Sequence, residues 1–257
     1  MTSGFVGLGT VLNVAAIVIG SLAGMAIGHR LPQRTREVVT DALGLITLLL
    51  AALSAAAVLD LSLIAAVGSG GAILIVLGAL ILGGIGGSLL QIETRLGGIA
   101  GTIQTWLSRR SGAEGGTDHA ARERFIEGWL TATLLFCVGP LAILGALSDG
   151  LGHGIDQLAV KSVIDGFAAM AFAASFGVGV LLSAAAVAVV QGLLTLAGYV
   201  LGQVVPPAPI AALTAVGGLL LVGIALRLLR IREIPVGDLL PAVVLAPLLT
   251  VLVVAFQ

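Results

Sequence analysis

Lys161 and Asp165 are the residues of this sequence most suited to chemistry, because they place opposite charges inside an apolar stretch. Lys161 is the only lysine, and its spacing of four residues from Asp165 places both side chains on one helix face within reach of each other. A charge at membrane depth costs roughly 2.5 to 3.5 kcal/mol on insertion scales. The pair is therefore a hypothesis for an ion or solute site, with Asp165 as the titrating group and Lys161 as its counter-charge. The alternative is a static pair whose lysine snorkels to the outer interface.

Uncharged polar residues occur in other apolar stretches of the chain. Thr10, Asn13 and Ser21 fall near one stripe of the first stretch, and Gln191 interrupts a later one. We expect the first three to supply neutral ligands along a polar path, although they are equally suited to hydrogen bonding between helices. Gln191 is a further candidate for binding the solute or ion. Asp149 follows another apolar stretch and is expected at the outer mouth of the site.

The composition identifies a polytopic membrane protein. The 257 residues have a mean hydropathy of +1.18, and only 10% are charged. Several apolar runs are long enough to cross a bilayer as helices, which satisfy their own backbone hydrogen bonds. Nothing indicates nucleic-acid binding, and the single cysteine, Cys137, excludes a disulfide framework. His153 and Asp156 are too sparse a set to indicate a metal, so no cofactor is expected.

These elements predict an all-α bundle in a single membrane domain, residues 1–257. Residues 91–127 read as an interfacial helix followed by a polar cytoplasmic loop, of which 108–124 is the hydrophilic part. A turn at 175–179 divides the stretch 158–202 into two spans; without it the chain has seven. Two spans place every arginine on one side of the membrane, which favours eight crossings with both termini outside the cytoplasm. The eight expected spans are 5–28, 41–59, 68–90, 128–147, 158–178, 180–202, 209–229 and 236–256.

Proline and glycine mark special positions within these spans. Pro140 lies inside the fourth span and should kink it. Gly20, Gly24 and Gly28 are spaced four apart and form overlapping motifs that let another backbone approach closely. Such faces serve helix packing within one chain, and they also fit a homo-oligomer.

A weak internal repeat relates the two ends of the chain. Residues 44–49 resemble 217–222, and 20–32 parallel 192–206 with a two-residue insertion. With eight spans, spans one to three and six to eight have opposite orientation. Inverted repeats of this kind are recurrent in secondary transporters, whose site lies near the midplane at the repeat interface.

Three motifs carry a resemblance over nearly the whole chain. They are Gly9-Thr-Val-Leu-Asn13 with Gly20-Ser21, Phe136-Cys-Val-Gly-Pro-Leu-Ala-Ile-Leu-Gly145 with Asp149-Gly150, and Lys161-Ser-Val-Ile-Asp165-Gly166. With them the chain resembles the YqgA/YdfK-like family of bacterial inner-membrane proteins, a domain of unknown function. The resemblance implies a multi-pass protein of the bacterial plasma membrane and supplies no substrate. The loop 108–124 and Arg227 depart from the family pattern.

The leading functional hypothesis is a membrane transporter or channel for a small solute or ion, coupled to a proton or cation through the Lys161–Asp165 pair. A membrane enzyme would need a clustered set of catalytic groups, which His29, His153 and Asp156 do not provide, so no enzyme is expected. The alternative is a non-transporting scaffold or sensor, with the segment 111–124 as a handle for a partner. The expected partners are the lipid bilayer and the small solute or ion.

Overall fold

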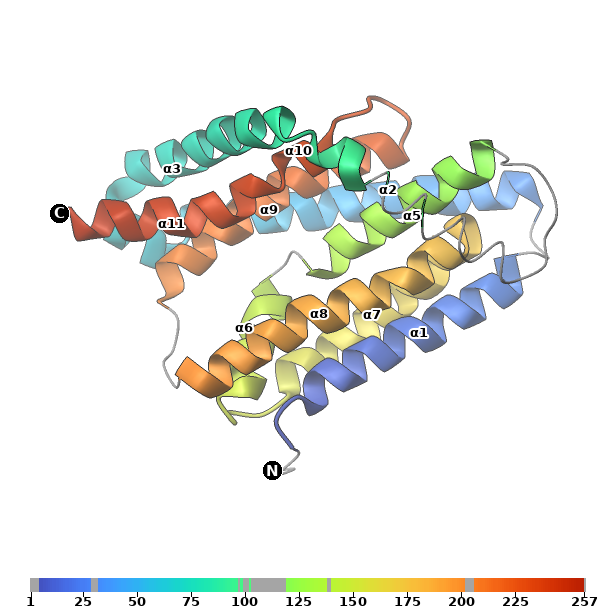
Figure 1. Ribbon diagram of the computed structural model, residues 1–257, viewed down its shortest axis with the longest axis horizontal. Helices are drawn as coiled ribbons and strands as arrows, with labels where there is room; N and C mark the ends of the chain where they lie inside the picture. Colours follow the sequence, from blue (N-terminus) through green and yellow to red (C-terminus); the bar gives the residue numbers. More distant parts are fainter. Residues whose placement is uncertain are drawn as a thin grey trace. The chain divides into compact units, whose positions relative to one another are not determined.

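The computed structural model describes residues 5–28, 32–96, 98, 102, 119–137, 140–201 and 206–256, and the regular elements in this part of the chain are all helical (Figure 1). The all-α fold is therefore confirmed. The elements are α1 (Leu8–Gly28), α2 (Gln33–Ala55), the 3-10 turn η1 (Ala56–Leu59), α3 (Leu61–Leu89), α5 (His119–Cys137), α6 (Pro140–Gly150), α7 (Asp156–Phe176), α8 (Val178–Leu201), α9 (Pro207–Leu228), α10 (Val236–Leu239) and α11 (Pro241–Ala255).

Seven spans of the described chain are long and apolar enough to cross a membrane. An eighth candidate is the pair Glu123–Cys137 and Leu141–Gly150, which bends by 74° at the break before α6. Outward-facing apolar side chains are numerous: Ile19 and Leu74 are each 66% exposed, and Val163 is 60% exposed. Water would oppose so much exposed apolar surface, whereas lipid accommodates it. The chain is thus a multi-pass helical membrane protein in contact with the bilayer.

Several expected boundaries change in the structure. The second span was expected to start at residue 41, but α2 begins at Gln33, because the Gln, Arg and Glu side chains there favour a helix and lie beyond the apolar run. The third span was expected at 68, but α3 begins at Leu61, where the carboxylate of Asp60 accepts a hydrogen bond from the Ser62 amide at 2.8 Å. That hydrogen bonding lowers the pKa of Asp60. Non-helical backbone at Gly68, with φ 75° and ψ 159°, kinks α3 instead.

Other boundaries follow the sequence more closely. The turn expected at 175–179 is confirmed, since Gly177 has a φ of 71° and separates α7 from α8. Pro140 opens α6 next to the break in the fourth span, a position where its missing N–H costs nothing. The expected polar loop is shorter than predicted, because α5 begins at His119. Most of the expected interfacial helix and loop lies outside the described residues.

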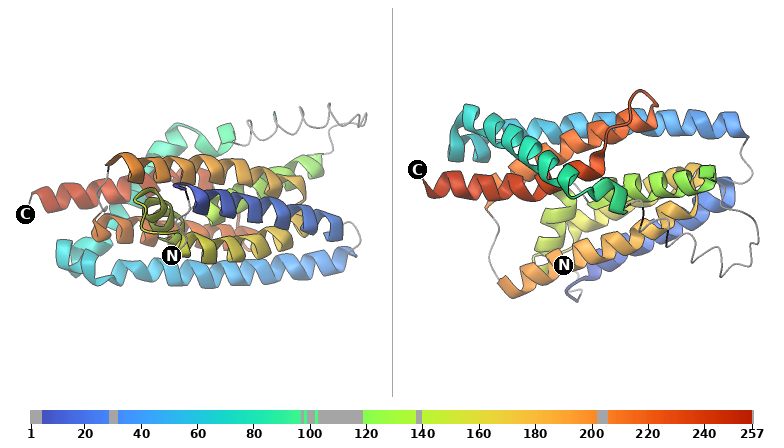
Figure 2. Two further views of the ribbon diagram at one scale, coloured as in Figure 1. Left: turned by 90° about the horizontal axis from the view of Figure 1, so that it is seen from below. Right: turned by 45° about the horizontal axis from the view of Figure 1, so that its top comes forward.

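The chain divides into two compact units, each of which has its own packing. The first comprises Met1–Thr40, Thr94–Cys137 and Leu141–Gly202, and contains α1, α5, most of α6, α7 and α8. Within it α1 contacts α7 and α8, and α5 contacts α8 and α7. The second comprises Asp41–Glu93, Val138–Pro140 and Gln203–Gln257; its helix α9 is largely buried and contacts α3, α11 and η1. Figure 2 shows α1, α7 and α8 side by side in the first unit.

The glycine stripe of α1 packs directly on α7. A Cβ atom at Gly20 would overlap the carbonyl of Gly166, one at Gly24 that of Met170, and one at Gly28 that of Ala174. Each step of four residues on α1 matches a step of four on α7, so the two helices run parallel with their backbones in contact. The packing role expected for these glycines is confirmed. The homo-oligomer stays a prediction, and this stripe is already covered by α7 of the same chain.

The Gly24→Ala variant should lower the thermal stability of the purified protein, because the added methyl group cannot fit against the Met170 carbonyl. Overpacking of this kind costs about 1–3 kcal/mol. Gly86→Ala on α3 is the matched control, since a Cβ there meets no atom within 4 Å. Melting temperatures measured in one detergent should fall for Gly24→Ala and hold or rise for Gly86→Ala. Equal melting temperatures for the two variants would contradict close packing of α1 on α7.

Candidate functional site

The charged pair on α7 is buried near the middle of its helix. Lys161 Nζ lies 2.6 Å from Asp165 Oδ2, and the two side chains are only 8% and 6% exposed. Asp165 is nine residues from the first residue of α7 and eleven from the last. The pairing expected from the four-residue spacing is present. Lys161 does not extend to the end of α7, as a snorkelling lysine would, but donates its hydrogen bond inside the first unit.

Two amide side chains from other helices extend this pair. Asn13 Nδ2 on α1 donates to Asp165 Oδ2 at 3.0 Å and to Gln191 Oε1 on α8 at 3.3 Å. Asn13 and Gln191 are both fully buried. We call Lys161, Asp165, Asn13 and Gln191 the buried network. It joins α7 and α1 at one carboxylate oxygen and α8 through the Asn13 amide, and it brings together residues that the sequence places far apart.

The buried network leaves one acceptor and one donor unused. Asn13 Oδ1 and Gln191 Nε2 are buried and have no hydrogen-bond partner. The orientation of Asn13 follows from Asp165, since an ionised carboxylate only accepts and must face the N–H₂ group. A buried polar atom without a partner costs about 1–3 kcal/mol, and such atoms call for a water, an ion or a ligand. The network can therefore receive a small group that donates one hydrogen bond and accepts another.

A pair of threonines lies one helical turn from the amides. Thr10 Oγ1 of α1 and Thr195 Oγ1 of α8 are 3.0 Å apart, and the residues are 8% and 5% exposed. Sequence reasoning included Thr10 and missed Thr195. The sequence does contain an indication of its position: Thr195 follows Gln191 by four residues, so the two side chains lie on the same face of α8.

Asp149 holds the start of α1. Its Oδ1 accepts from the Gly7 amide at 3.1 Å and its Oδ2 from the Gly9 amide at 3.0 Å. The residue is 3% exposed. A helix start has unpaired N–H groups and a partial positive charge, so a carboxylate from α6 stabilises it. Both of its oxygens thus bond to the backbone in this state, and the expectation that Asp149 lies at the outer mouth of the site as a ligand stays a prediction.

The remaining predicted residues lie apart from the network. Ser21 is fully buried and its hydroxyl has no partner, but it follows Asn13 by eight residues, or about 12 Å along α1. Pro140 starts α6, and the stripe of Gly20, Gly24 and Gly28 packs on α7. Ser21 therefore stays a candidate ligand at another depth, while the proline and the glycines are structural.

A second polar cluster lies in the second unit. Arg227 Nη1 is 2.6 Å from Glu93 Oε1, while Glu93 Oε2 accepts from the Gly237 amide at 2.6 Å. In return, Asp238 Oδ1 accepts from the Glu93 amide at 2.9 Å. These reciprocal bonds fasten the segment after α3 to the start of α10. Arg227 thus has a structural partner in this chain.

Comparison with known proteins places these features in a family context. The family described as "Protein of unknown function (DUF554)" matches residues 8–251. The chain is 30% identical to the uncharacterized protein YqgA of Escherichia coli (strain K12) over 239 residues, covering 93% of this chain and 94% of that protein. It is 25% identical to the uncharacterized membrane protein YdfK of Bacillus subtilis (strain 168) over 250 residues, covering 96% and 97%. No solved structure matches.

Removing one charge of the buried pair should destabilise the protein more than removing both. Lys161→Met or Asp165→Asn alone leaves an uncompensated buried charge, which costs about 3–5 kcal/mol, whereas an uncharged pair in the same place is often neutral. The melting temperature should therefore fall in each single variant and recover in the double variant Lys161→Met/Asp165→Asn. The prediction would be wrong if the single variants melted at the wild-type temperature, or if the double variant lost as much melting temperature as the two single variants added together. Either result would mean that neither charge is stabilised by the other.

Loss of the Asp149 carboxylate should weaken the start of α1. Asp149→Ala removes two hydrogen bonds from a charged acceptor, each worth about 1.5–3 kcal/mol. Hydrogen exchange at the amides of residues 7–9 should speed up in this variant. Asp156→Ala is the control, because it removes a carboxylate that is exposed to solvent in the first turn of α7. Unchanged exchange at Gly7 and Gly9 would show that Asp149 is not their partner in the membrane.

Proposed function

The chain belongs to the DUF554 family of proteins of unknown function, and we propose that it is a transporter that moves a small solute or ion across the bacterial plasma membrane. In this proposal Asp165 is the group at which the substrate or its coupling ion binds. The observation that carries it is the buried network, in which an ion pair and two incompletely bonded amides meet inside a membrane-spanning bundle.

Burial of charge supports a binding role over a purely structural one. A buried ion pair is often no more stabilising than well-packed apolar residues of the same volume. The contact of α1 with α7 already has a glycine stripe to hold it, so helix packing alone does not require Lys161 and Asp165. Ionisable residues inside a membrane bundle typically mark a pathway for ions or protons. The unused atoms of Asn13 and Gln191 add hydrogen-bonding capacity beside the same carboxylate.

The mechanism that fits this geometry is competition for Asp165. Lys161 serves as an internal counter-cation, with its ammonium on Asp165 Oδ2. An incoming cation replaces that ammonium at Asp165 and releases Lys161 from its partner. An incoming proton has the same effect on the pair, because a neutral Asp165 no longer holds Lys161 electrostatically. Either event frees Asn13 Nδ2 to change partners and transmits the change to Gln191 on α8.

The inverted repeat belongs to this proposal. The two halves of the repeat begin with α1 and α8, and both lie in the first unit, while the helices that follow each of them lie largely in the second. Asn13 of α1 bonds to Gln191 of α8, so the helices that begin the two halves meet at the network. Secondary transporters that are built from inverted repeats have their binding site at the interface between the two repeats.

We propose a carrier, and neither an enzyme nor a channel with a permanent pore. The residues of the buried network are each 6% exposed or less, so the site is closed in this state. A closed site that opens by partner exchange suits a carrier, which exposes its site to one side at a time.

Transport can be measured with purified protein in proteoliposomes, by recording transient current and internal pH. Simple cations, anions and small metabolites form the panel. The wild type should give a substrate-dependent signal that Asp165→Asn abolishes while keeping a monodisperse, folded protein. Asp156→Asn, at the exposed start of the same helix, should keep the signal. Silence of the wild type across the panel, or an equal signal from Asp165→Asn, would favour a scaffold or sensor.

A further inference from the structure

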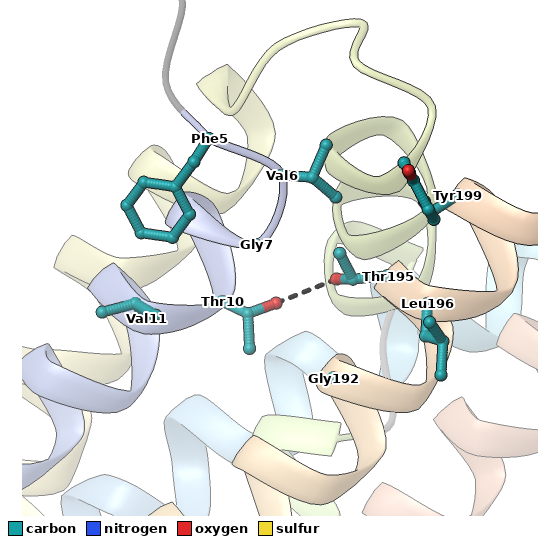
Figure 3. Close-up of a pocket in the computed structure, with 9 residues that line it drawn as sticks. All are labelled: Phe5, Val6, Gly7, Thr10, Val11, Gly192, Thr195, Leu196 and Tyr199. Atoms are coloured by element: carbon teal, nitrogen blue, oxygen red, sulfur yellow. Dashed lines mark hydrogen bonds between the residues drawn. The ribbon is translucent and has the colours of Figure 1, made fainter.

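A pocket of about 590 Å³ opens between α1 and α8 in the first unit (Figure 3). Its walls are mostly apolar and include Phe5, Val11, Leu196 and Tyr199. Its polar side-chain groups are the hydroxyl of Tyr199 and those of Thr10 and Thr195, and the two threonines bond to each other across the two helices. This volume is in the range of pockets that hold small molecules.

Only one helical turn separates the pocket from the buried network. Thr10 precedes Asn13 by three residues, or about 4.5 Å along α1, and Thr195 follows Gln191 by four, or about 6 Å along α8. Because Asn13 and Gln191 are fully buried, the threonine pair is the single polar layer between them and the pocket. Rotation of two hydroxyl-bearing side chains is a small change compared with movement of a helix.

The opposite direction along α1 is closed by a much thicker layer. Ile17 is fully buried, and beyond it Gly20 and Gly24 pack on the α7 backbone. Opening the site toward that end requires separation of two helices in backbone contact. The site therefore has a thin barrier toward the pocket and a thick one away from it.

We propose that this pocket is the vestibule through which the substrate reaches Asp165, and that the Thr10–Thr195 pair is its gate. The inference rests on the proposed transport function and adds a route and a substrate class. Apolar walls offer no ligands to a dehydrated ion. The pocket instead suits a solute of metabolite size with an apolar body and a polar group that donates and accepts hydrogen bonds. Such a group matches the unused Asn13 Oδ1 and Gln191 Nε2 beyond the gate.

Cysteine accessibility tests whether water fills the vestibule. The chain has one cysteine, so a Cys137→Ala background carries single reporter thiols. Val11→Cys lines the pocket, and Val163→Cys on the outer face of α7 is the control; the native valines are 54% and 60% exposed. A charged, water-soluble methanethiosulfonate should react with Val11→Cys about tenfold faster or more, because the reactive thiolate forms only where water is present. Equal, slow reaction at both positions, with labelling only by a lipid-soluble maleimide, would show a lipid-facing groove and overturn the vestibule.

Filling the pocket tests its role in transport. Gly192 lines the pocket and a Cβ there meets no atom within 4 Å, so the backbone has room for a side chain, and Gly192→Phe is designed to fill the pocket. Gly86→Phe on α3, equally free of neighbours, is the matched control. Gly192→Phe should slow both the labelling of Val11→Cys and the Asp165-dependent transport signal by about tenfold, and Gly86→Phe neither. Full transport by Gly192→Phe would overturn the vestibule while leaving the role of Asp165 intact. Absence of any Asp165-dependent signal in the wild type would instead overturn the proposed function, whatever the labelling shows.

Discussion

A carboxylate held inside an apolar helical bundle must keep its partners, and the hydrogen-bonded network around Asp165 comes from three helices. Lys161 approaches from the same helix and Asn13 from α1, while Gln191 on α8 is held through Asn13. With little water available, the loss of any partner leaves charge or hydrogen-bonding capacity unsatisfied. The first unit therefore contains an arrangement whose burial costs free energy and which any molecule that offers Asp165 a different partner can change.

The close approach of α1 to α7 makes this arrangement feasible. Asn13 has a short side chain, so it reaches Asp165 only if the two backbones are close. The glycines at 20, 24 and 28 permit that approach, and the Asp149 carboxylate fixes the start of α1 above it. Glycine stripe, helix cap and buried network thus act together: the first two position α1, and the third uses that position. The same close packing closes one side of the site and leaves the thinner threonine layer on the other.

Local features of the sequence predicted what depends on local geometry. The four-residue spacing of Lys161 and Asp165 was sufficient to pair them, and the glycine-rich stretch at 175–179 was sufficient to place the turn between α7 and α8. Contacts between distant segments were not predictable in the same way. Nothing near Gln191 indicates that it meets Asn13, and the hydrogen bonds from Asp149 to the start of α1 were not predicted because the two segments are distant in the sequence. The bend of 74° before α6 is also larger than a proline kink alone suggests.

The central claim is that Lys161 exchanges its partner, and Lys161 is the only lysine in the chain. Protein labelled with ¹⁵N-lysine therefore carries a single side-chain Nζ resonance, which reports the state of this ammonium without assignment. We would record that resonance in lipid across pH and across the same cation and metabolite panel, with Asp165→Asn beside the wild type. Our account predicts a resonance that shifts or exchanges when an active substrate is added, toward the position seen in Asp165→Asn. A single resonance unmoved by every substrate and every pH would show a static ion pair and contradict the account.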